Sequence, residues 1–325
     1  MKNVTILVPE RSFLQTIADS QNCFYRVNRF LSNSGREPLF NVKLAGATKA
    51  IVLNKGNYSV HPDKLIRQIK RTDLIIIPAL AGDVSKAITA NKNLIPWIVE
   101  QYKSGAEIAS LCVGAFLLAA TGLLNGKKCS THWDFTDRLQ MMFPDVSVQD
   151  GSIITEENGI YTSGGANSYW NLLLHLVEKY TDREIAVYIS KYFAIDINRN
   201  TQSAFAIFNS QKEHNDKEVR KAQDYIEKKF DEKITVEDLA SKVALHRRSL
   251  ERRFRQATGN SVLEYIQRVK VEAAKRSFET TPKQINEVMF NVGYNDAKAF
   301  RNTFRKITGL TPFEYRSRYN KIIVK

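Results

Sequence analysis

The stretch ASLCVGAFLLAATGLL (109–124) passes from a short apolar run into small, helix-forming residues, and Cys112 lies at the change. A nucleophile held on a sharp strand-to-helix turn is a common way to present a reactive atom above an α/β sheet. The stretch therefore predicts a strand, a tight turn and a helix. It also raises the question of whether Cys112 does chemistry.

The sequence around this turn alternates strand-like apolar runs with helical patterns. The strand-like runs are VTILVP (4–9), FNVKL (40–44), DLIIIPAL (73–80) and EIASL (107–111). Helical patterns extend to Phe30 and cover 85–102 and 114–123, and a further segment, 61–70, precedes the third strand-like run. This alternation predicts an α/β fold with a doubly wound parallel sheet, whose functional residues cluster where strands end and helices begin.

Length and charge predict a second, different domain. A chain of 325 residues exceeds the size at which one core comfortably keeps growing. From residue 213 onward there are 25 Lys and Arg against 16 Asp and Glu, a net charge of +9, whereas residues 1–212 carry +5. A basic terminal domain indicates a polyanionic partner, most commonly nucleic acid.

The cysteine content and the apolar runs indicate the compartment. Cys23, Cys112 and Cys129 form neither a metal-ligand spacing nor an even disulfide framework, so no metal and no cofactor is expected. The first apolar run is too short for a secretory signal, and no later run is long enough to span a bilayer. We therefore predict a cytoplasmic protein without a membrane partner.

The last third of the chain contains two copies of one unit. RSLERRFRQATGNSVLEYIQR (248–268) aligns with KAFRNTFRKITGLTPFEYRSR (298–318) at a shift of 50 residues. Each copy has a helix-ending glycine, Gly259 or Gly309, followed by a capping box, Ser261 with Glu264 or Thr311 with Glu314. Short helical segments precede both copies, at 235–243 and 284–292. A short helix, a tight turn and a basic helix form the helix-turn-helix pattern.

Helical spacing separates a core face from a basic outer face in both copies. Leu250 and Phe254 share one face of the first basic helix, as Phe300 and Phe304 do in the second. The outer faces hold the predicted DNA-binding residues, which are Arg247, Arg248, Glu251, Arg252, Lys298, Arg301 and Asn302. A solvated helix face would explain one such copy, but two copies with the same arrangement favour contact with DNA. Arg suits guanine and Asn suits adenine in the major groove.

Residues 1–205 resemble the ThiJ/PfpI branch of the class I glutamine amidotransferase-like superfamily. The resemblance rests on SLCVGAFLLAATGLLNGKKCSTHWDF (110–135) and YTSGGANSYWNLLLHLVEKY (161–180), and is nearest to the sensor domains of GlxA-type transcriptional regulators. Catalysts of this superfamily often place a histidine after the cysteine and an acid in the first strand–helix connection. This chain has Val113 and Gln15 there, so no catalytic residue is assigned. The resemblance favours a ligand pocket at Cys112, Val113 and His132.

Residues 217–320 resemble the AraC/XylS-type DNA-binding domain. VGYNDAKAFRNTFRKITGLTPFEYR (292–316) matches that family's signature almost throughout, although Ala297 stands where a polar residue is common. The resemblance implies two helix-turn-helix units joined by a long helix at about 262–278. Both recognition helices would enter successive major grooves on one face of the DNA. The outer-face residues named above fall on positions that family members use for base contact.

Together these patterns predict a ligand-responsive transcriptional regulator. Its expected parts are a sensor or dimerisation domain (1–205), a linker (206–216) and an AraC-type DNA-binding domain (217–325). Its expected partners are double-stranded DNA, an unidentified small-molecule effector, a second copy of the chain and RNA polymerase. The alternative is a cysteine-dependent hydrolase or amidase tethered to DNA, and a third interpretation is redox sensing through Cys112.

Overall fold

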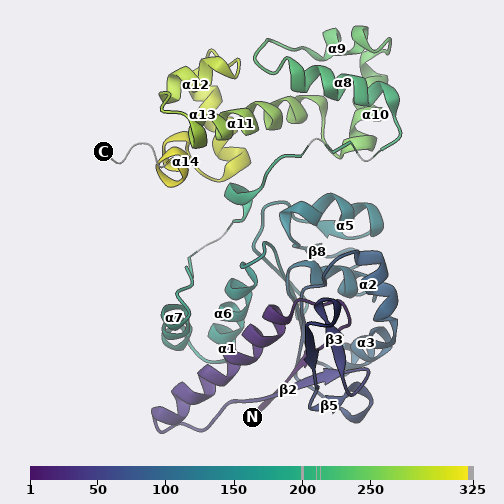
Figure 1. Cartoon of the computed structure of the whole chain (residues 1–325), viewed down its shortest axis with the longest axis vertical. Coiled ribbons are helices and arrows are strands. Elements are labelled where there is room, and N and C mark those ends of the chain that lie inside the picture. The colour runs from purple at the N-terminus through teal and green to yellow at the C-terminus, as the bar shows by residue number, and fades with distance from the viewer. Residues whose placement is uncertain (199–200, 210, 213, 321–325) are drawn as a thin grey trace. The chain divides into compact units, whose positions relative to one another are not determined.

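A computed structural model describes residues 1–198, 201–209, 211–212 and 214–320 of the chain. The residues outside it, 199–200, 210, 213 and 321–325, fall within the predicted domain and linker ranges. The chain divides into two compact units, residues 1–202 and 203–325 (Figure 1). The predicted boundaries at 205 and 217 remain predictions, because compactness alone does not locate a functional domain.

The first unit is built on a seven-stranded sheet in the order β10-β11-β7-β6-β1-β2-β5. Its strands are β1 (Lys2–Leu7), β2 (Phe40–Gly46), β5 (Lys64–Leu65), β6 (Leu74–Ile77), β7 (Glu107–Ser110), β10 (Ile154–Glu157) and β11 (Ile160–Ser163). All neighbours pair in parallel except β10 and β11, which form an antiparallel hairpin at one edge. The α/β prediction is confirmed, and the sheet is mixed rather than wholly parallel.

Helices cover both faces of this sheet. On one face lie α1 (Leu14–Asn33), α6 (Tyr169–Tyr180) and α7 (Arg183–Tyr192), and on the other α2 (Val84–Ala90) and α3 (Ile95–Lys103) with the short α4 (Ala115–Ala119) and α5 (Thr136–Met142) (Figure 1). The four residues of β6 are fully buried, since apolar side chains on both faces of the central strand meet a helix layer.

Local structure departs from the sequence expectations in several places. The predicted helix 114–123 is α-helical only over α4. The predicted helix 85–102 is split into α2 and α3, because the chain turns at Lys92–Leu94 and Pro96 starts a new helix. The segment 61–70 forms only β5 and one 3-10 turn. Two small strand pairs were not predicted, namely the hairpin of β3 (Ile51–Leu53) with β4 (Tyr58–Val60) and the pair β8 (Lys128–Cys129) with β9 (Ser147–Val148).

The second unit consists, among its described residues, of α-helices and one 3-10 turn at Ser203–Phe205. The α-helices are α8 (Lys217–Lys228), α9 (Val236–Lys242), α10 (Arg247–Thr258), α11 (Val262–Thr280), α12 (Ile285–Asn291), α13 (Ala297–Thr308) and α14 (Pro312–Tyr319). Two apolar clusters divide the unit, one around Phe254 and one around Phe304, and the long helix α11 contributes to both. The two predicted helix-turn-helix units and the long helix that joins them are confirmed.

The repeat is reproduced at the helix ends. Gly259 and Gly309 both end a recognition helix in the left-handed conformation, with φ of +71° and +75°. Both predicted capping boxes form, because the hydroxyls of Ser261 and Thr311 each accept the backbone N–H of the glutamate three residues later. The glycines thus end α10 and α13 at equivalent positions, and the capping boxes start α11 and α14 at equivalent positions.

The segment 203–209 packs against α11. The ring of Phe208 lies 5.1 Å from that of Tyr265, and the Phe208 N–H donates to the Glu272 carboxylate at 3.2 Å. The buried Lys275 ammonium donates to the Ala206 carbonyl oxygen at 2.5 Å and to Glu272 at 2.7 Å. Part of the predicted linker 206–216 is thus held by buried polar groups of the second unit.

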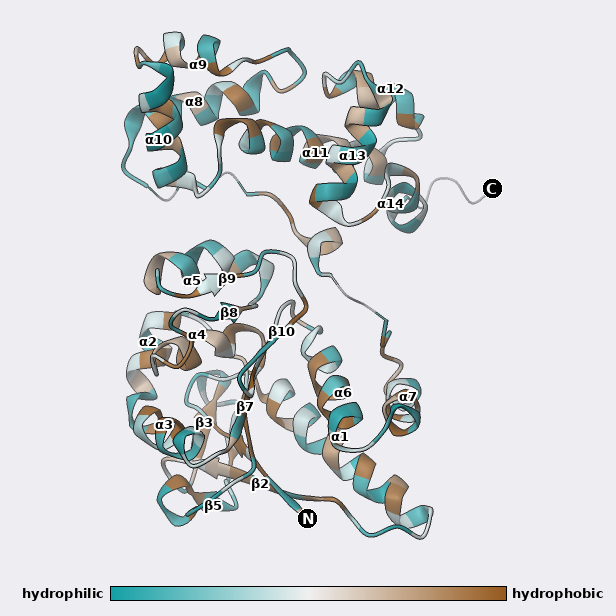
Figure 2. Ribbon diagram, turned by 180° about the vertical axis from the view of Figure 1, so that it is seen from behind, coloured by the Kyte–Doolittle hydropathy of each residue, from teal (hydrophilic) through white to brown (hydrophobic). Residues whose placement is uncertain are grey.

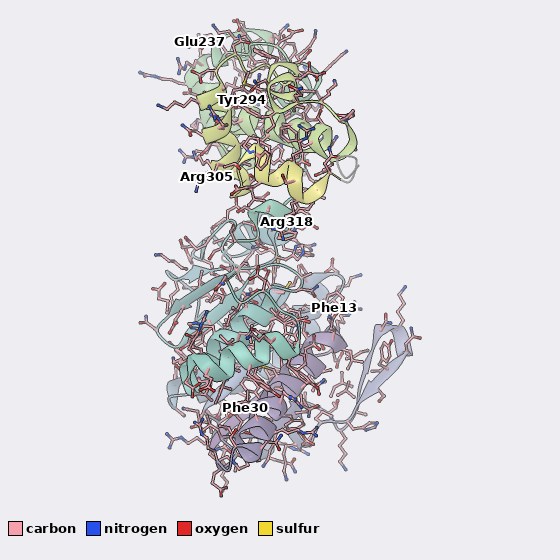
Figure 3. The ribbon with its side chains drawn as sticks, turned by 90° about the vertical axis from the view of Figure 1, so that its left-hand side faces the viewer. Phe13, Phe30, Glu237, Tyr294, Arg305 and Arg318 are labelled. Carbon is pink, nitrogen blue, oxygen red and sulfur yellow. The ribbon has the colours of Figure 1, made fainter. Side chains whose placement is uncertain are left out.

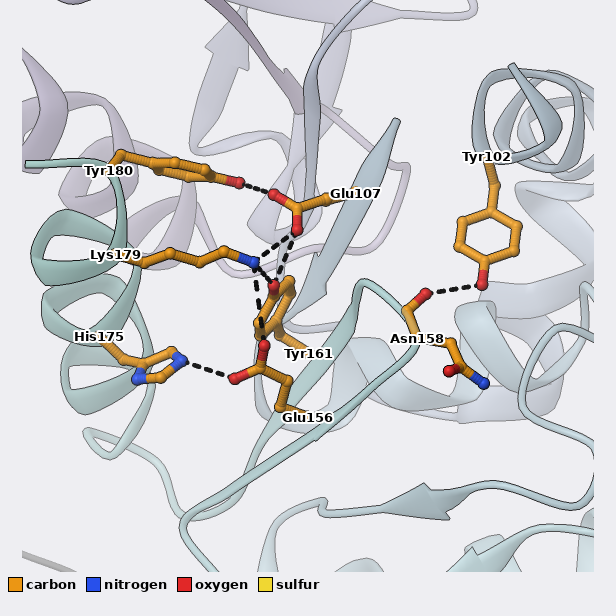
Figure 4. A network of polar contacts seen from close by, with 8 residues as sticks. All are labelled: Tyr102, Glu107, Glu156, Asn158, Tyr161, His175, Lys179 and Tyr180. Atoms are coloured by element: carbon orange, nitrogen blue, oxygen red, sulfur yellow. Dashed lines mark hydrogen bonds and ion pairs between the residues drawn. The ribbon is translucent and has the colours of Figure 1, made fainter. Parts of the chain in front are cut away.

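A dense polar network lies at the amino end of β7, the end opposite Cys112 (Figure 4). The Glu107 carboxylate accepts hydrogen bonds from Lys179, Tyr161 and Tyr180. Burial alone would raise the pKa of Glu107, but these hydrogen bonds outweigh it and hold the pKa below its usual value. The network ties β7 and β11 to α6, so it has a structural explanation.

We expect Glu107→Gln to lower the free energy of unfolding at neutral pH by about 2 kcal/mol, because the amide replaces a charged acceptor. A lowered pKa stabilises the fold above the unfolded-state pKa, and that stability is lost as pH falls through the folded-state pKa. The variant should therefore show a flatter dependence of unfolding free energy on pH between about 5 and 3.

Urea unfolding at several pH values measures this effect. Glu184→Gln, at an exposed position of α7, is the matched control. If the unfolding free energies of the wild type and Glu107→Gln depended on pH in the same way, the lowered pKa assigned to Glu107 would be wrong.

Candidate functional site

The predicted turn at Cys112 is a strained elbow. Cys112 has a φ of +53°, which is uncommon for a residue other than glycine, and the 3-10 turn Cys112–Gly114 leads directly into α4. Gly114 permits this path, since a Cβ there would lie 2.6 Å from the Pro78 carbonyl oxygen and 2.8 Å from that of Ile77. The strand–turn–helix geometry inferred from 109–124 is therefore present.

The thiol at this elbow is buried and poorly ionised. Cys112 and Val113 are each 5% exposed. Burial raises the pKa of the Cys112 thiol to about 12, against a smaller lowering by the Val113 backbone N–H. The Cys112 N–H donates to the Ser163 Oγ at 3.1 Å, so a donor that could stabilise an oxyanion already has a partner. This environment is the reverse of one that activates a cysteine.

His132 is near the elbow in the fold but is not bonded to the thiol. Thr131, its neighbour, donates its hydroxyl to the Cys112 carbonyl oxygen at 3.2 Å. The His132 Nδ1 accepts the Asp134 N–H at 3.1 Å, which assigns the proton of the neutral ring to Nε2. Burial lowers the pKa of His132, and the Asp134 carboxylate opposes this. No hydrogen bond joins Cys112 to His132 within the described residues.

The acidic residue on the first helix lies one turn beyond the position that sequence reasoning considered. Gln15 is exposed. Asp19, four residues later on α1, accepts hydrogen bonds from the Tyr169 hydroxyl at 2.6 Å and the Trp170 indole N–H at 3.2 Å. A spacing of four residues on one helix face was the signal that could have identified Asp19. Its carboxylate is engaged with α6 rather than with the thiol.

Gln202, the last residue of the first unit, is bonded on both sides of His132. Its side-chain amide donates to the Thr131 carbonyl oxygen at 2.8 Å, and its side-chain oxygen accepts the Trp133 N–H at 3.1 Å. Gln202 is 1% exposed, and sequence reasoning missed it. The loop that carries His132 is therefore tied directly to the chain segment that leaves the first unit.

Two buried hydroxyl groups beside this loop have no hydrogen-bond partner. They are the Oγ atoms of Ser130 and Ser168. A buried polar group without a partner costs about 1–3 kcal/mol, and a bound water or ligand commonly accounts for it. Ser168 also lies against Gly165, where a Cβ would be 2.6 Å from its hydroxyl oxygen.

The second candidate surface is the outer face of the two recognition helices, α10 and α13. Both repeat the same burial pattern, with two core aromatic or aliphatic residues and an exposed polar face (α10 is largely teal in Figure 2). Of the predicted DNA-binding residues, those with exposed side chains are Arg247, Arg248, Arg252, Lys298, Arg301 and Asn302, and Glu251 is partly exposed.

Contacts distinguish the members of this face. Arg247 pairs with Glu251 at 3.2 Å and with Glu237, so it is held by ion pairs within the first helix-turn-helix. Arg301 donates to the Ala297 carbonyl oxygen of its own helix. Sequence reasoning left out Arg255 and Arg305, which are exposed at equivalent positions of the two copies and were aligned by the 50-residue shift (Arg305 is labelled in Figure 3).

Neither a candidate metal cluster nor a candidate membrane-spanning helix occurs in the part of the chain that the structure describes. Within those ranges, no group of three or more His, Cys, Asp or Glu residues could hold a metal ion. No helix of the described chain has both the length and the apolar character needed to cross a membrane.

Comparisons with known families match both parts of the chain. The DJ-1/PfpI family matches residues 29–179, the part that contains the Cys112 elbow. A helix-turn-helix domain family matches residues 239–318, the part that contains both recognition helices.

Curated relatives match the chain across both parts. The regulator GbdR of Pseudomonas aeruginosa is 25% identical over 258 residues, which cover 79% of this chain and 69% of GbdR. The regulator GlxA of Rhizobium meliloti is 24% identical over 219 residues, 66% of each chain. Both are named HTH-type transcriptional regulators.

A solved structure supports the fold. An AraC family transcriptional regulator from Pseudomonas putida superposes with a TM-score of 0.50 at 16% identity, over 59% of this chain and 100% of that one. At this identity the likeness establishes the fold alone.

We expect Cys112 to resist alkylation in the native protein. With a pKa of about 12, its thiolate fraction at neutral pH is about a thousandfold below that of an ordinary thiol. Iodoacetamide labelling followed by peptide mass spectrometry measures the rate for each cysteine. Cys129, whose pKa burial also raises to about 12, is the internal comparison. Rapid, selective labelling of Cys112 would instead support the hydrolase or redox interpretation.

Proposed function

We propose that the chain is an AraC-type transcriptional regulator whose DJ-1/PfpI-family domain senses a small-molecule ligand through the Cys112 elbow and the His132 loop. The protein is a sequence-specific DNA-binding regulator of transcription. Binding of the ligand would change the affinity of the helix-turn-helix domain for its DNA site.

The observation that carries DNA recognition is the duplicated basic face. Arg252 of α10 and Arg301 of α13 are both exposed, one turn or less from a buried phenylalanine that anchors its helix. Exposed Arg and Asn side chains on a recognition helix suit the base edges of the major groove. We assign base contact to Arg248, Arg252, Lys298, Arg301 and Asn302, and phosphate contact to Arg255 and Arg305.

We assign Arg247 and Glu251 a different role in this interface. Their mutual ion pair, extended by Glu237, holds the start of α10 against α9. DNA phosphate could replace the carboxylates as the partner of Arg247, since exposed ion pairs contribute little to stability. Glu251 would then accept from a cytosine amino group or orient a neighbouring arginine.

The ligand assignment is supported by the polar groups around the elbow. The His132 Nε2–H and the unpartnered hydroxyls of Ser130 and Ser168 offer hydrogen bonds to a small polar molecule. Cys112 and Val113 would form the apolar floor of the site. A ligand changes DNA binding only if it binds one arrangement of the protein better than another. Gln202 is hydrogen-bonded to both neighbours of His132. We propose that its position changes when the ligand binds.

We also propose that the elbow performs no turnover. The raised pKa of Cys112, the engagement of its N–H with Ser163, and the engagement of Asp19 with Tyr169 all oppose nucleophilic catalysis. The strained turn would then be retained because it positions the Cys112 carbonyl against Thr131, and not because it presents a thiol.

Other parts of the proposal rest on the family. We propose a homodimer formed through the first unit, RNA polymerase as a further partner, and a cytoplasmic location, which the three unpaired thiols also favour. We keep 1–205 as the sensor domain, 206–216 as the connection and 217–325 as the DNA-binding domain.

We expect the double variant Arg252→Ala, Arg301→Ala to bind a duplex selected from a random pool about 100-fold more weakly than the wild type. The variant should also discriminate less among base changes within the selected site, because both side chains are assigned to base edges. Fluorescence anisotropy with the selected duplex and with base-substituted duplexes, at one salt concentration, measures both quantities.

The control for this experiment is Arg220→Ala, Lys221→Ala, which removes the same charge from the exposed surface of α8. Equal effects of the two double variants would indicate general electrostatic attraction. They would contradict the assigned faces.

We expect a thermal-shift screen of small metabolites against the full chain to find a compound that stabilises it and changes its affinity for the selected duplex. His132→Ala should reduce both responses. It should leave the ligand-free melting temperature nearly unchanged, because the ring is partly exposed and its Nδ1 hydrogen bond stays within its own loop. A stabilising compound whose effects survive His132→Ala would place the ligand elsewhere.

A further inference from the structure

A buried lysine in the middle of α11 connects the two helix-turn-helix units. Lys270 is 7% exposed. Its ammonium donates hydrogen bonds to the carbonyl oxygens of Glu232 at 3.2 Å, Val292 at 3.1 Å and Gly293 at 3.2 Å. A buried ammonium with three carbonyl acceptors has a full set of partners.

These three carbonyl groups come from different halves of the second unit. Glu232 lies between α8 and α9, in the first half. Val292 caps α12, and Gly293 begins the turn that leads into the second recognition helix, α13. Carbonyl groups at a helix end lack intrahelical partners and favour a cation. A single side chain therefore satisfies acceptors from both halves.

Backbone packing at the same point leaves no space between the halves. Gly293 has a φ of +73°, and a Cβ there would lie 2.4 Å from the Asp231 carbonyl oxygen. Phe230, from the first half, packs against the apolar cluster of the second half. The Tyr294 ring covers the ammonium, with its centroid 5.5 Å from the Lys270 Nζ (Tyr294 is labelled in Figure 3).

The internal repeat shows what is particular to Lys270. The position 50 residues later is Asn320, which is also 7% exposed. Its amide donates to the Phe278 carbonyl oxygen at 2.6 Å and to that of Thr281 at 2.9 Å, both at the end of α11. Their counterparts in the first copy are residues 228 and 231, next to Glu232. In both copies this side chain therefore donates to backbone carbonyl groups near the end of the copy's first helix. The Lys270 side chain is longer than that of Asn320, and it also donates to Val292 and Gly293 of the second copy.

Helix α11 packs into the apolar clusters of both halves. It ends at Thr280, and residues 281–284 connect it to α12. Apolar packing is non-directional, so by itself it opposes small shifts of α12 and α13 along α11 only weakly. The Lys270 hydrogen bonds are directional and join both halves at one point, so they oppose such shifts.

Building on the proposed function, we infer that Lys270 fixes the distance and orientation between α10 and α13, and thereby the spacing of the two half-sites that the DNA must present. It is a positioning residue, since its side chain is buried and its ammonium is bonded to backbone carbonyl groups. Two recognition helices that enter successive major grooves require half-sites about 10 base pairs apart. We call the contacts of Lys270 and Gly293 between the two halves the junction. A protein with a fixed junction binds other spacings weakly, whereas one with a loosened junction binds them with similar affinity.

The test measures affinity for duplexes in which the two half-sites of the selected sequence are moved apart or together by one and two base pairs. The full-length wild type should prefer one spacing by about tenfold or more. Lys270→Met should retain the base preference within each half-site but discriminate among spacings less than about threefold. Lys270→Arg should restore the discrimination.

Two further variants control for charge and for folding. Lys221→Met removes the same charge from exposed α8 and should keep the wild-type spacing profile. Gly293→Ala keeps the lysine but forces the halves apart, and should broaden the profile as Lys270→Met does. Circular dichroism at the assay temperature confirms that each variant is folded.

The outcomes separate this inference from the proposed function. A folded Lys270→Met and a folded Gly293→Ala with the wild-type spacing profile would overturn the role of the junction and leave DNA recognition intact. A wild type that selects no sequence at all would overturn both. If Lys270→Met does not fold, Gly293→Ala alone decides between a broadened and an unchanged profile.

Discussion

Backbone polar groups that become buried at helix ends must find partners, and this constraint determines where the functional elements lie. Both recognition helices stop at a left-handed glycine, and a capping box starts the next helix in each copy. At the junction between the two helix-turn-helix units, carbonyl groups from both halves share the Lys270 ammonium. The same constraint acts in the first unit, where Gln202 satisfies backbone groups on both sides of His132.

The first unit shows how an elbow can keep its shape without keeping reactive surroundings. The backbone path at Cys112 depends on Gly114 and on the carbonyl groups of Ile77 and Pro78, none of which depends on the thiol. Burial suppresses ionisation of Cys112, and the nearest acid on α1 is bonded to Tyr169 and Trp170. A site of this kind suits recognition of a ligand better than covalent chemistry.

Much of the architecture could be predicted from the sequence because its signals are local. The apolar run LIII marked β6, the strand-like stretch EIASL marked β7, and the 50-residue repeat marked both helix-turn-helix units with their caps. The split of α2 from α3 was missed, because apolar spacing continues across Lys92–Leu94 although the chain turns there. The β3–β4 hairpin was missed because its strands are three residues long, too short for a periodic pattern.

The sequence by itself determined the two folds, the elbow and the basic outer faces, since each follows from residue types at short, regular spacing. Only the tertiary structure decided which polar groups meet. Asp19 with Tyr169, Gln202 with the His132 loop, and Lys270 with Gly293 are separated by 150, 71 and 23 residues. Such partnerships depend on how the elements pack, because the free energy that selects them comes from burial and not from neighbours in the chain. The ion pair of Arg247 with Glu237 likewise could not be predicted from the sequence, because it depends on how α9 packs against α10.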